Sequence, residues 1–497
     1  MLRIIKYVLI NIILIYGFNC LAKQNISLTT HHKINDYLKS VMQNHGIPGM
    51  AVAIVVDGEV AYNASFGQSS LELEKSVDSD TIFRIFSATK LITATAVFQL
   101  VEQGKINLKD KLPLFFDGLP NQWQGVKIEN LLTHSSGLPD LLKFKYSLSD
   151  EELFKKLYDE KMDFTTGDQF RYNQTNYWLL ALIIKKVTGL TFVEYVYSQQ
   201  FNATTNGVLF SSNSLLLTPN RAVRYYYDFK ERKHVRDRNN SGVRGYSGNG
   251  FNVSLNEWIA WNKRLDNNQL LNKESKNKMW SGFDYTNKAD DFGYGWGHYP
   301  VSSYDSWGFT GGNLAAFRKF INEDVTIIFL SNGYTYPAHD IVINDLAKMI
   351  IPELKNKKLI RQEDIWRQVF DAEYEKAKAS YVQLKIENPK TAFDNLKWNI
   401  NSLGNRYIRE KKPEEALHVF KFNVQTNPGW WVAIAGLAEI YEVQGLFDQA
   451  LGNYKKAIEL NLNNEWDYNK QMHDKVNELS LKQQNLNYHA HGIKALI

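Results

Sequence analysis

The feature that most constrains the fold is a change of character near Leu359. From about residue 30 to 355, apolar runs typical of strands alternate with helical periods and short breaks. Past Leu359, glycine becomes rare, strand-like runs disappear and the remaining segments are helical. The 497-residue length fits two or three domains. We therefore predict an α/β domain over residues 23–355, followed by a small all-α repeat domain over residues 356–497.

A β-hairpin is predicted at the start of the α/β domain. Residues 49–56 form an apolar run rich in β-branched side chains, and residues 59–66 alternate between apolar and polar side chains. Asp57-Gly58 between them is a strong two-residue turn signal. The two runs therefore predict adjacent antiparallel strands.

The far end of the α/β domain carries two more predicted strands, at residues 313–317 and 325–330. Helical periods lie between the two strand regions, notably at residues 88–103 and 177–187. Strands at both ends with helices between them predict one antiparallel sheet flanked by helices, with a helical lobe inserted.

The first 22 residues have the pattern of a secretory signal peptide. Arg3 and Lys6 precede an apolar run over residues 7–16, and Cys20-Leu21-Ala22 offers small residues at a cleavage position. We predict an exported protein, periplasmic or secreted, with an uncleaved membrane anchor or lipidation of Cys20 as the alternatives. Cleavage after Ala22 removes the only cysteine and excludes disulfides and a catalytic thiol from the mature chain.

Charge gives no indication of a nucleic-acid partner. The formal net charge is +5, from 58 basic and 53 acidic side chains, and no long basic block occurs. We therefore predict a small-molecule or peptide substrate and no nucleic acid.

A repeat of about 34 residues occurs in the helical part. Small and large apolar residues recur at equal offsets, namely Leu403, Tyr407, Ala416 and Phe420 and then Leu437, Tyr441, Ala450 and Tyr454. This pattern resembles tetratricopeptide units. Two units are fewer than such a fold needs to stand alone, so we expect them to pack on the helices of residues 365–386 or on the α/β domain. Binding of a protein partner and a purely structural role are both open.

Ser87-Ala-Thr-Lys90 is the main indication of chemistry. A serine hydroxyl is a weak nucleophile and needs a base within hydrogen-bond reach. A lysine three residues later on a helix lies on the same face, and burial and the helix N-terminus both lower its pKa. Ser275 and Lys278 have the same spacing, but they lie in a polar stretch, which predicts a solvent-exposed segment. Ser87 instead follows the apolar residues 82–86 and opens an apolar helix.

The segments around Ser87 resemble the penicillin-binding-protein and class C β-lactamase superfamily. The resemblance covers residues 30–345 and has motifs in the expected order, at residues 45–49 (HGIPG), 83–90 (FRIFSATK), 102–110 (EQGKINLKD) and 131–138 (LLTHSSGL). It implies the β-lactamase/transpeptidase-like fold with Ser87 as the nucleophile. It also implies that His134 braces a loop and is not catalytic.

The family's second motif, Tyr-x-Asn, has its counterpart at Tyr172-Asn173-Gln174. The resemblance gives Tyr172, together with Lys90, the role of moving the proton from the serine and later to the leaving group. Gln174 stands where the family has asparagine, and Asn173 and Asn176 are alternatives for that role.

The third motif, Lys-Thr-Gly or His-Thr-Gly in the family, has its counterpart at residues 308–312. Thr310 and Gly311 match, whereas Phe309 replaces the basic residue. The resemblance implies an oxyanion hole formed by the backbone N–H groups of Ser87 and Gly312. We interpret Arg318 as a surface residue, with a charge supplied to the site as the alternative. The glycine-rich residues 245–250 match a family loop and are expected to act conformationally.

Together these features predict an exported serine hydrolase that forms an acyl-enzyme at Ser87, without metal or cofactor. The expected substrate is a small ester, a D-amino-acid peptide or a related amide, and Phe309 favours an esterase or peptidase over an efficient β-lactamase. One alternative is a D-alanyl-D-alanine carboxypeptidase of the penicillin-binding type. Another is a catalytically silent scaffold that binds partners through its helical repeats.

Overall fold

The computed structural model describes residues 26–201, 206–228, 231–287, 292–301, 304–356, 362–387, 393–462 and 468–494. The predicted signal peptide at residues 1–22, including Cys20, lies outside the described residues. Contacts divide the chain into two compact units, residues 1–357 and 358–497.

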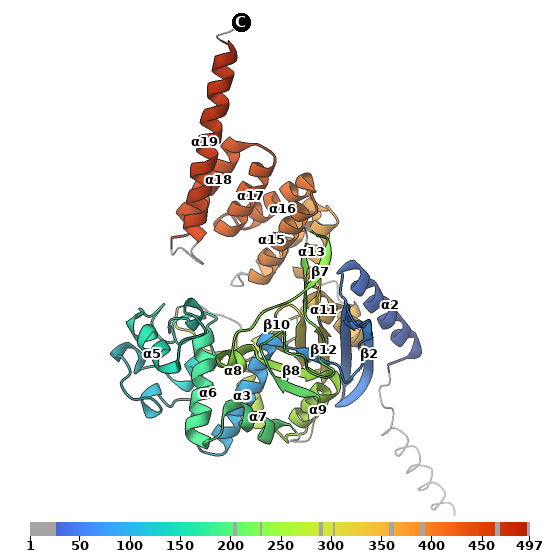
Figure 1. Cartoon of the computed structure of the whole chain (residues 1–497). Helices are drawn as coiled ribbons and strands as arrows, with labels where there is room; N and C mark the ends of the chain where they lie inside the picture. The colour runs from blue at the N-terminus through green and yellow to red at the C-terminus, as the bar shows by residue number, and fades with distance from the viewer. Residues whose placement is uncertain are drawn as a thin grey trace, which may run out of the picture. The chain divides into compact units, whose positions relative to one another are not determined.

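The first unit is built on a seven-stranded antiparallel sheet in the order β3-β2-β1-β12-β11-β10-β9 (Figure 1). Its strands are β1 (Gly49–Val56), β2 (Glu59–Ser70), β3 (Lys75–Ser76), β9 (Gly297–His298), β10 (Ser306–Gly311), β11 (Ala315–Phe320) and β12 (Val325–Ser331). The predicted hairpin is confirmed as β1 and β2. Asp57 and Gly58 between them both have positive φ, of 51° and 75°, as a type I′ turn requires.

The sheet has an apolar layer on each face, because alternate side chains of a strand point to opposite faces. In β1, Ala51 and Ala53 contribute to one core, whereas Met50, Val52 and Ile54 contribute to the other. The helices that contribute to the Met50 core are α2 (Leu28–Asn44), α11 (His339–Ile350) and α12 (Pro352–Asn356). The sheet therefore lies between two helical layers, and neither face of its central strands meets solvent (Figure 1).

The larger core carries the inserted helical lobe. Its helices are α3 (Thr89–Glu102), α4 (Ile128–Leu132), α5 (Asp150–Asp159), α6 (Gln174–Thr188), α7 (Phe192–Gln200), α9 (Leu255–Asp266) and α10 (Lys273–Met279). The short helix α8 (Tyr246–Asn249) packs against α3 and α6. Small antiparallel sheets join β4 (Ile82–Arg84), β8 (Phe251–Ser254) and β5 (Val208–Phe210), and separately β6 (Tyr225–Asp228) and β7 (Lys233–Arg236). The predicted antiparallel sheet with a helical lobe is confirmed.

The second Ser-x-x-Lys segment is only in part the polar surface that its sequence predicts, since Asn277 and Lys278 are exposed. It lies in α10, where Ser275 and Lys276 are buried. The Lys276 ammonium donates hydrogen bonds to the carbonyl oxygens of Leu265 and Asp266 at 2.9 and 3.1 Å. The prediction is wrong for Ser275 and Lys276, because the Lys276 side chain caps the end of α9 and so enters the protein interior.

The second unit is helical throughout its described residues. Its helices are α13 (Gln362–Phe370), α14 (Tyr374–Glu387), α15 (Asp394–Arg409), α16 (Pro413–Thr426), α17 (Trp431–Val443), α18 (Phe447–Leu460) and α19 (Tyr468–Lys494). The two repeat segments form the pairs α15–α16 and α17–α18. Helices α13 and α14 share a core with α15 and α16. The repeats therefore pack on the preceding helices, which was the first of the two arrangements expected from the sequence.

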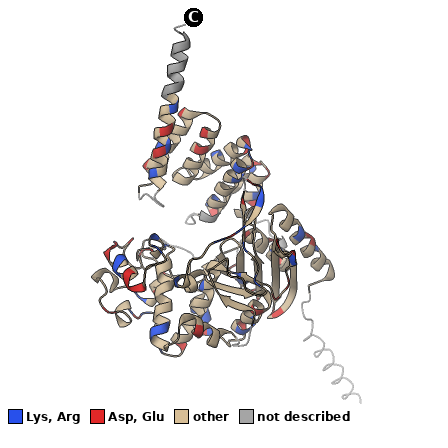
Figure 2. Cartoon of the chain, viewed as in Figure 1, with Lys and Arg blue, Asp and Glu red and all other residues tan. Residues whose placement is uncertain are grey.

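Basic and acidic residues are interspersed along the helices, with both signs on α5 and on α19 (Figure 2). Within the described part of the chain, no helix has the length and apolar character that crossing a bilayer requires.

Candidate active site

Ser87 lies on a constrained turn between strand β4 and helix α3. The turn is a short 3-10 helix over Phe86–Ala88, and it is tied to its surroundings by hydrogen bonds from Ala88 N to Ile85 O and from Ile85 N to Phe251 O. Phe86 has a φ of 46°, in the left-handed region that a bulky residue rarely occupies. Such strain persists only where the surroundings impose it, and it concentrates at functional sites. The turn presents Ser87 at the beginning of α3.

Tyr172 lies against Ser87. Its phenol oxygen donates a hydrogen bond to the Ser87 Oγ at 2.8 Å. Burial raises the pKa of Tyr172 to about 12, although its hydrogen bonds with Ser87 and Gln174 act in the opposite direction. The phenol is therefore neutral at pH 7, while 38% of the residue surface stays open to solvent. Tyr172 is thus placed to relay a proton rather than to act as a standing base.

Lys90 is completely buried one helical turn after Ser87. Its ammonium nitrogen donates to the Gly248 carbonyl at 2.9 Å and to the Gln174 Oε1 at 3.3 Å. It also lies 4.6 Å from the centre of the Tyr172 ring. Burial lowers the pKa of Lys90 to about 7, and Asp140 opposes this shift. Near pH 7, about half of the Lys90 side chains are therefore neutral, and the neutral amine is the form that a general base requires.

Gln174, and neither of the two nearby asparagines, is the amide that contacts Lys90. Asn173 caps α6 and donates to the Leu138 carbonyl at 2.5 Å. Asn176 is buried and accepts a hydrogen bond from the Ser136 hydroxyl at 2.6 Å. Both asparagines therefore organise the loop before α6, and Gln174 occupies the position beside the lysine.

Asp140 is a site residue that sequence reasoning missed. One of its carboxylate oxygens accepts a hydrogen bond from Gln174 N at 3.2 Å, and the other accepts from Leu142 N at 3.0 Å. It is also the charged group that favours the ammonium form of Lys90. The sequence did offer a signal for Asp140: it follows the family motif at residues 131–138 by two residues, and it precedes a short helical turn. Asp140 thus fixes the start of α6 and moderates the lysine pKa.

His134 braces this arrangement, as the resemblance implied. It is buried, and its Nδ1 accepts a hydrogen bond from Asn173 N at 3.1 Å and lies 3.1 Å from the Asn176 amide nitrogen. Burial, followed by the charge of Lys90, holds the His134 pKa well below its ordinary value. A neutral imidazole that accepts from a backbone N–H carries its proton on Nε2. His134 therefore positions the segment that carries Tyr172 and Gln174.

Strand β10 runs directly against the turn that carries Ser87. A Cβ on Gly311 would lie 1.7 Å from the Ile85 carbonyl oxygen and 3.0 Å from the Ala88 nitrogen. Gly312 has a φ of 57°, and a Cβ there would lie 2.8 Å from the Phe86 ring. Only glycines permit this approach. It brings the backbone of Gly312 next to the turn of Ser87, where the predicted oxyanion hole requires it.

Phe309 forms an apolar wall where the family has a cation. The residue is 6% exposed, and its ring centre lies 5.7 Å from that of Phe292 and 6.3 Å from that of Tyr172. The Lys90 nitrogen lies 5.9 Å from the Phe309 ring. The only ammonium group in this immediate cluster of described residues is therefore Lys90 itself.

Arg318 is not a surface residue, so the sequence-based interpretation is wrong. It lies on β11, is 2% exposed, and donates to the Thr310 Oγ1 at 2.5 Å and to the Asp340 carboxylate at 2.9 Å. Although burial alone would raise the pKa of Asp340, His339 and Arg318 hold it below its ordinary value. Both faces of β11 are covered, so even a charged residue of this strand is buried. Arg318 contacts the site through its hydrogen bond to Thr310, and its charge is neutralised by the ion pair with Asp340.

The comparison with protein families gives a match to the family model described as Beta-lactamase, over residues 34–348. Penicillin-binding protein 4* of Bacillus subtilis is 26% identical over 318 residues, which is 58% of this chain and 69% of that protein. Protein flp of Staphylococcus aureus is 26% identical over 176 residues, and the match spans only 35% of that protein.

Solved structures show the same fold. The octameric penicillin-binding protein homologue of Pyrococcus abyssi superposes with a TM-score of 0.56 and 24% identity, covering 67% of this chain and 81% of that one. The penicillin-binding protein of Bacillus halodurans gives 0.53 and 25%, covering 63% and 99%. D-amino acid amidase of Ochrobactrum anthropi gives 0.55 and 16%, covering 65% and 99%. On the strength of the family match over residues 34–348, the chain belongs to the β-lactamase family, and it has penicillin-binding proteins among its relatives.

Proposed function

We propose that this protein is a serine hydrolase whose α/β domain, residues 23–355, forms an acyl-enzyme at Ser87. The observation that carries the proposal is the hydrogen bond of 2.8 Å between Tyr172 and Ser87, made beside a buried Lys90 with a pKa of about 7. These contacts support a cluster in which Ser87 is the nucleophile, Tyr172 the proton relay and Lys90 the base. Export by residues 1–22 belongs to the same proposal.

In the acylation step, the Ser87 Oγ attacks an ester or amide carbonyl carbon. Its proton passes to neutral Lys90, with the Tyr172 hydroxyl as relay, and the carbonyl oxygen becomes an oxyanion held by the N–H groups of Ser87 and Gly312. The intermediate collapses when the leaving oxygen or nitrogen takes up a proton from Lys90 through Tyr172. Water then attacks the acyl-enzyme by the same proton route and regenerates Ser87.

The substrate that we propose is a small ester, a D-amino-acid peptide or a related amide. The wall formed by Phe309 offers no charge to a substrate carboxylate, and Arg318 is already paired with Asp340 at 2.9 Å. An apolar wall beside the nucleophile favours substrates without a carboxylate at that position. A D-alanyl-D-alanine carboxypeptidase is the second candidate, because penicillin-binding protein 4* is among the relatives. Release of D-alanine from a D-Ala-D-Ala peptide distinguishes the two.

The nucleophile is tested by intact-mass measurement after incubation with a fluorophosphonate and, separately, with benzylpenicillin. We expect the wild type to gain one fluorophosphonate adduct and Ser87→Ala to gain none. Ser275→Ala is the matched control, since it removes the other serine of a Ser-x-x-Lys segment, and it should label like the wild type. Absence of any adduct on folded wild-type protein would overturn the enzyme proposal and favour the scaffold. A stable penicillin adduct would favour the carboxypeptidase.

Phe309 is expected to control discrimination between charged and neutral substrates. We predict that Phe309→Lys raises the rate of acylation by benzylpenicillin, relative to that by an uncharged ester, by at least about tenfold, because one hydrogen bond to a charged group contributes about 1.5–3 kcal/mol. Phe309→Met keeps the wall apolar and should leave the ratio unchanged. The ratio of the two rates is measured on the same preparation, so that partial unfolding cancels. An unchanged ratio in Phe309→Lys would show that this wall does not face the substrate.

A further inference from the structure

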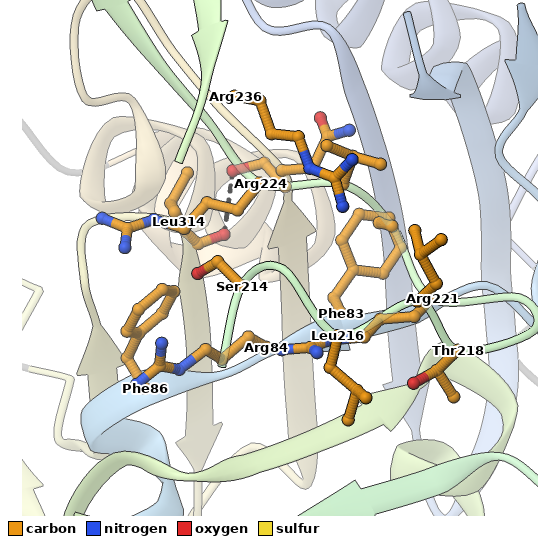
Figure 3. Close-up of a pocket in the computed structure, with 15 residues that line it drawn as sticks. Phe83, Arg84, Phe86, Ser214, Leu216, Thr218, Arg221, Arg224, Arg236 and Leu314 are labelled. Atoms are coloured by element: carbon orange, nitrogen blue, oxygen red, sulfur yellow. Dashed lines mark hydrogen bonds between the residues drawn. The ribbon is translucent and has the colours of Figure 1, made fainter. Parts of the chain in front are cut away.

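A recess beside the nucleophile turn is lined by four arginines (Figure 3). Arg84 comes from strand β4, Arg221 and Arg224 come from the segment before β6, and Arg236 ends β7. Among the described residues that line the recess, none is acidic. This is unlike the mixed charges elsewhere on the chain (Figure 2).

Within the described ranges, two of these arginines have only uncharged hydrogen-bond acceptors. Arg84 donates to the Ser212 carbonyl at 3.1 Å and to the carbonyl and side-chain oxygens of Asn249 at 3.2 and 3.1 Å. Arg221 donates to the Asn213 carbonyl at 2.8 Å. These contacts hold the guanidinium groups in place, but they do not neutralise their charge.

Carboxylates compensate the other two arginines only in part. Arg224 forms an ion pair with Asp237 at 2.9 Å. Glu72 lies close enough to Arg236 to interact electrostatically, but it also accepts a hydrogen bond from the Tyr225 hydroxyl. The Nε atoms of Arg224 and Arg236 are both buried without a hydrogen-bond partner in the part of the chain that the structure describes. Four guanidinium groups are therefore opposed by two carboxylates.

Arg224 and Arg221 repel the Arg84 guanidinium electrostatically in this recess. Burial, followed by the charges of Arg224 and Arg221, lowers the pKa of Arg84 to about 10, so Arg84 is still charged at pH 7. The guanidinium carbons of Arg84 and Arg224 lie 4.4 and 4.6 Å from the centre of the same Phe86 ring. An anion in the recess would relieve this repulsion, and arginine is well suited to phosphate and carboxylate groups.

The same recess has an apolar side that opens to solvent. Leu216 and Leu217 line it and are 48% and 80% exposed, and the neighbouring Leu215 is exposed as well. Phe83 and Leu314 line it from the interior. Consecutive exposed leucines next to a cluster of arginines fit a ligand with an anionic group and an apolar portion.

We propose that this recess binds the phosphate or carboxylate group of an amphiphilic molecule, whose apolar part lies along Leu216 and Leu217. The proposal goes beyond the hydrolase function and does not depend on Ser87. The occupied site would adjoin the catalytic turn, because Phe86 lines the recess and immediately precedes Ser87.

The test is calorimetric titration of the full chain with octyl phosphate, octanoate and inorganic phosphate. We expect saturable binding of octyl phosphate or octanoate, and at least tenfold weaker binding of inorganic phosphate. Arg236→Gln is the preferred variant and should weaken octyl ligands at least tenfold, with Arg221→Gln as the second variant if the first fails to fold. Lys233→Gln removes a charge from the same strand outside the recess and should have no effect. Leu217→Ser should weaken octyl phosphate and leave inorganic phosphate unchanged.

Sedimentation with phosphatidylglycerol vesicles, compared with phosphatidylcholine vesicles, identifies the source of the ligand. Binding to the anionic vesicles that Arg236→Gln abolishes assigns a lipid surface, and octyl-ligand binding without sedimentation assigns a free amphiphile. The proposal is overturned if neither octyl ligand binds saturably, or if Arg236→Gln and Arg221→Gln bind as the wild type does. Inorganic phosphate binding as tightly as octyl phosphate would overturn the apolar part of the site. None of these readouts requires a live nucleophile.

Discussion

Replacing Lys90 with methionine is expected to suppress acylation of Ser87 and, at the same time, to stabilise the folded protein. Loss of a positioned general base lowers the rate by about 10²–10⁴-fold. Methionine fills a similar volume, and the buried site no longer has to hold a group that prefers water. The two effects have opposite signs because the property that makes Lys90 useful, its low pKa, is a consequence of unfavourable burial.

The pH dependence of stability follows from the same shift. Lys90 has a pKa of about 7 in the folded protein against an ordinary value of 10.5. Between these values the unfolded chain binds more protons, so the free energy of unfolding rises with pH from about 7 to about 10.5. The full cost of burying the Lys90 ammonium, on the order of 5 kcal/mol, is present at and below pH 7. Because Lys90→Met leaves the Gly248 carbonyl without its donor, we expect a net gain of about 2–4 kcal/mol at pH 7, which shrinks toward pH 10.

The measurements are the acylation rate by a fluorophosphonate from pH 5 to 9 and the denaturant midpoint at pH 7 and 10. The wild-type rate should rise through pH 7 and then level off, and Lys90→Met should lack this inflection. Lys276→Met is the matched control, because Lys276 is also buried with a pKa lowered mainly by burial. It should leave the acylation rate unchanged. A Lys90→Met rate within tenfold of the wild type would exclude Lys90 as the base.

Gly311→Ala is expected to disrupt the site with little change in chemistry at position 311. The added methyl group would meet the Ile85 carbonyl oxygen at 1.7 Å, far inside contact distance. The atom it meets belongs to the backbone of the nucleophile turn, so either β10 or the turn has to move. Overpacking of this kind costs about 1–3 kcal/mol or more, and a displacement near 1 Å can lower a catalytic rate about 100-fold.

Gly125→Ala is the matched control, because a Cβ there meets nothing within 4 Å. Acylation rates and denaturant midpoints are compared for the two variants at saturating reagent. We expect Gly311→Ala to lose at least 100-fold in rate while still folding at low temperature, and Gly125→Ala to match the wild type. Wild-type acylation by Gly311→Ala would show that β10 does not set the position of Ser87.

Local patterns were sufficient to predict the elements around the site. The Asp57-Gly58 turn and its flanking runs predicted β1 and β2, and the helical period after Ser87 predicted α3 to within one residue at each end. The predicted strand at residues 313–317 begins two residues later, at Ala315. Backbone conformation at these positions depends on nearby residues, which is why the sequence alone predicted it.

Burial of charged residues could not be predicted in the same way. Arg318 and Asp140 are both polar residues with no local sign of burial, and each is fixed by an element distant in sequence. Lys276, within the second Ser-x-x-Lys segment, is likewise buried, with its ammonium group held by the carbonyl oxygens of Leu265 and Asp266. For Arg318, the deciding fact is that helices cover both faces of the sheet, a property of the assembled layers. The partner residues, and hence the electrostatics of the site, emerge only from tertiary structure.

The order of strands in the sheet also governs when this unit can be completed during synthesis. Strand β1 pairs on one edge with β2, but its other edge pairs with β12, where Met50 lies opposite Ser331. These partners are 281 residues apart (331 − 50), and ribosomes add about 5–20 residues per second. For roughly 15–55 s, the wholly apolar β1 therefore has one unpaired edge exposed to its surroundings. A chaperone that binds residues 49–56 and prevents aggregation is thus expected to raise the yield of folded protein. The gain should be larger than for a fold in which paired strands are consecutive in sequence.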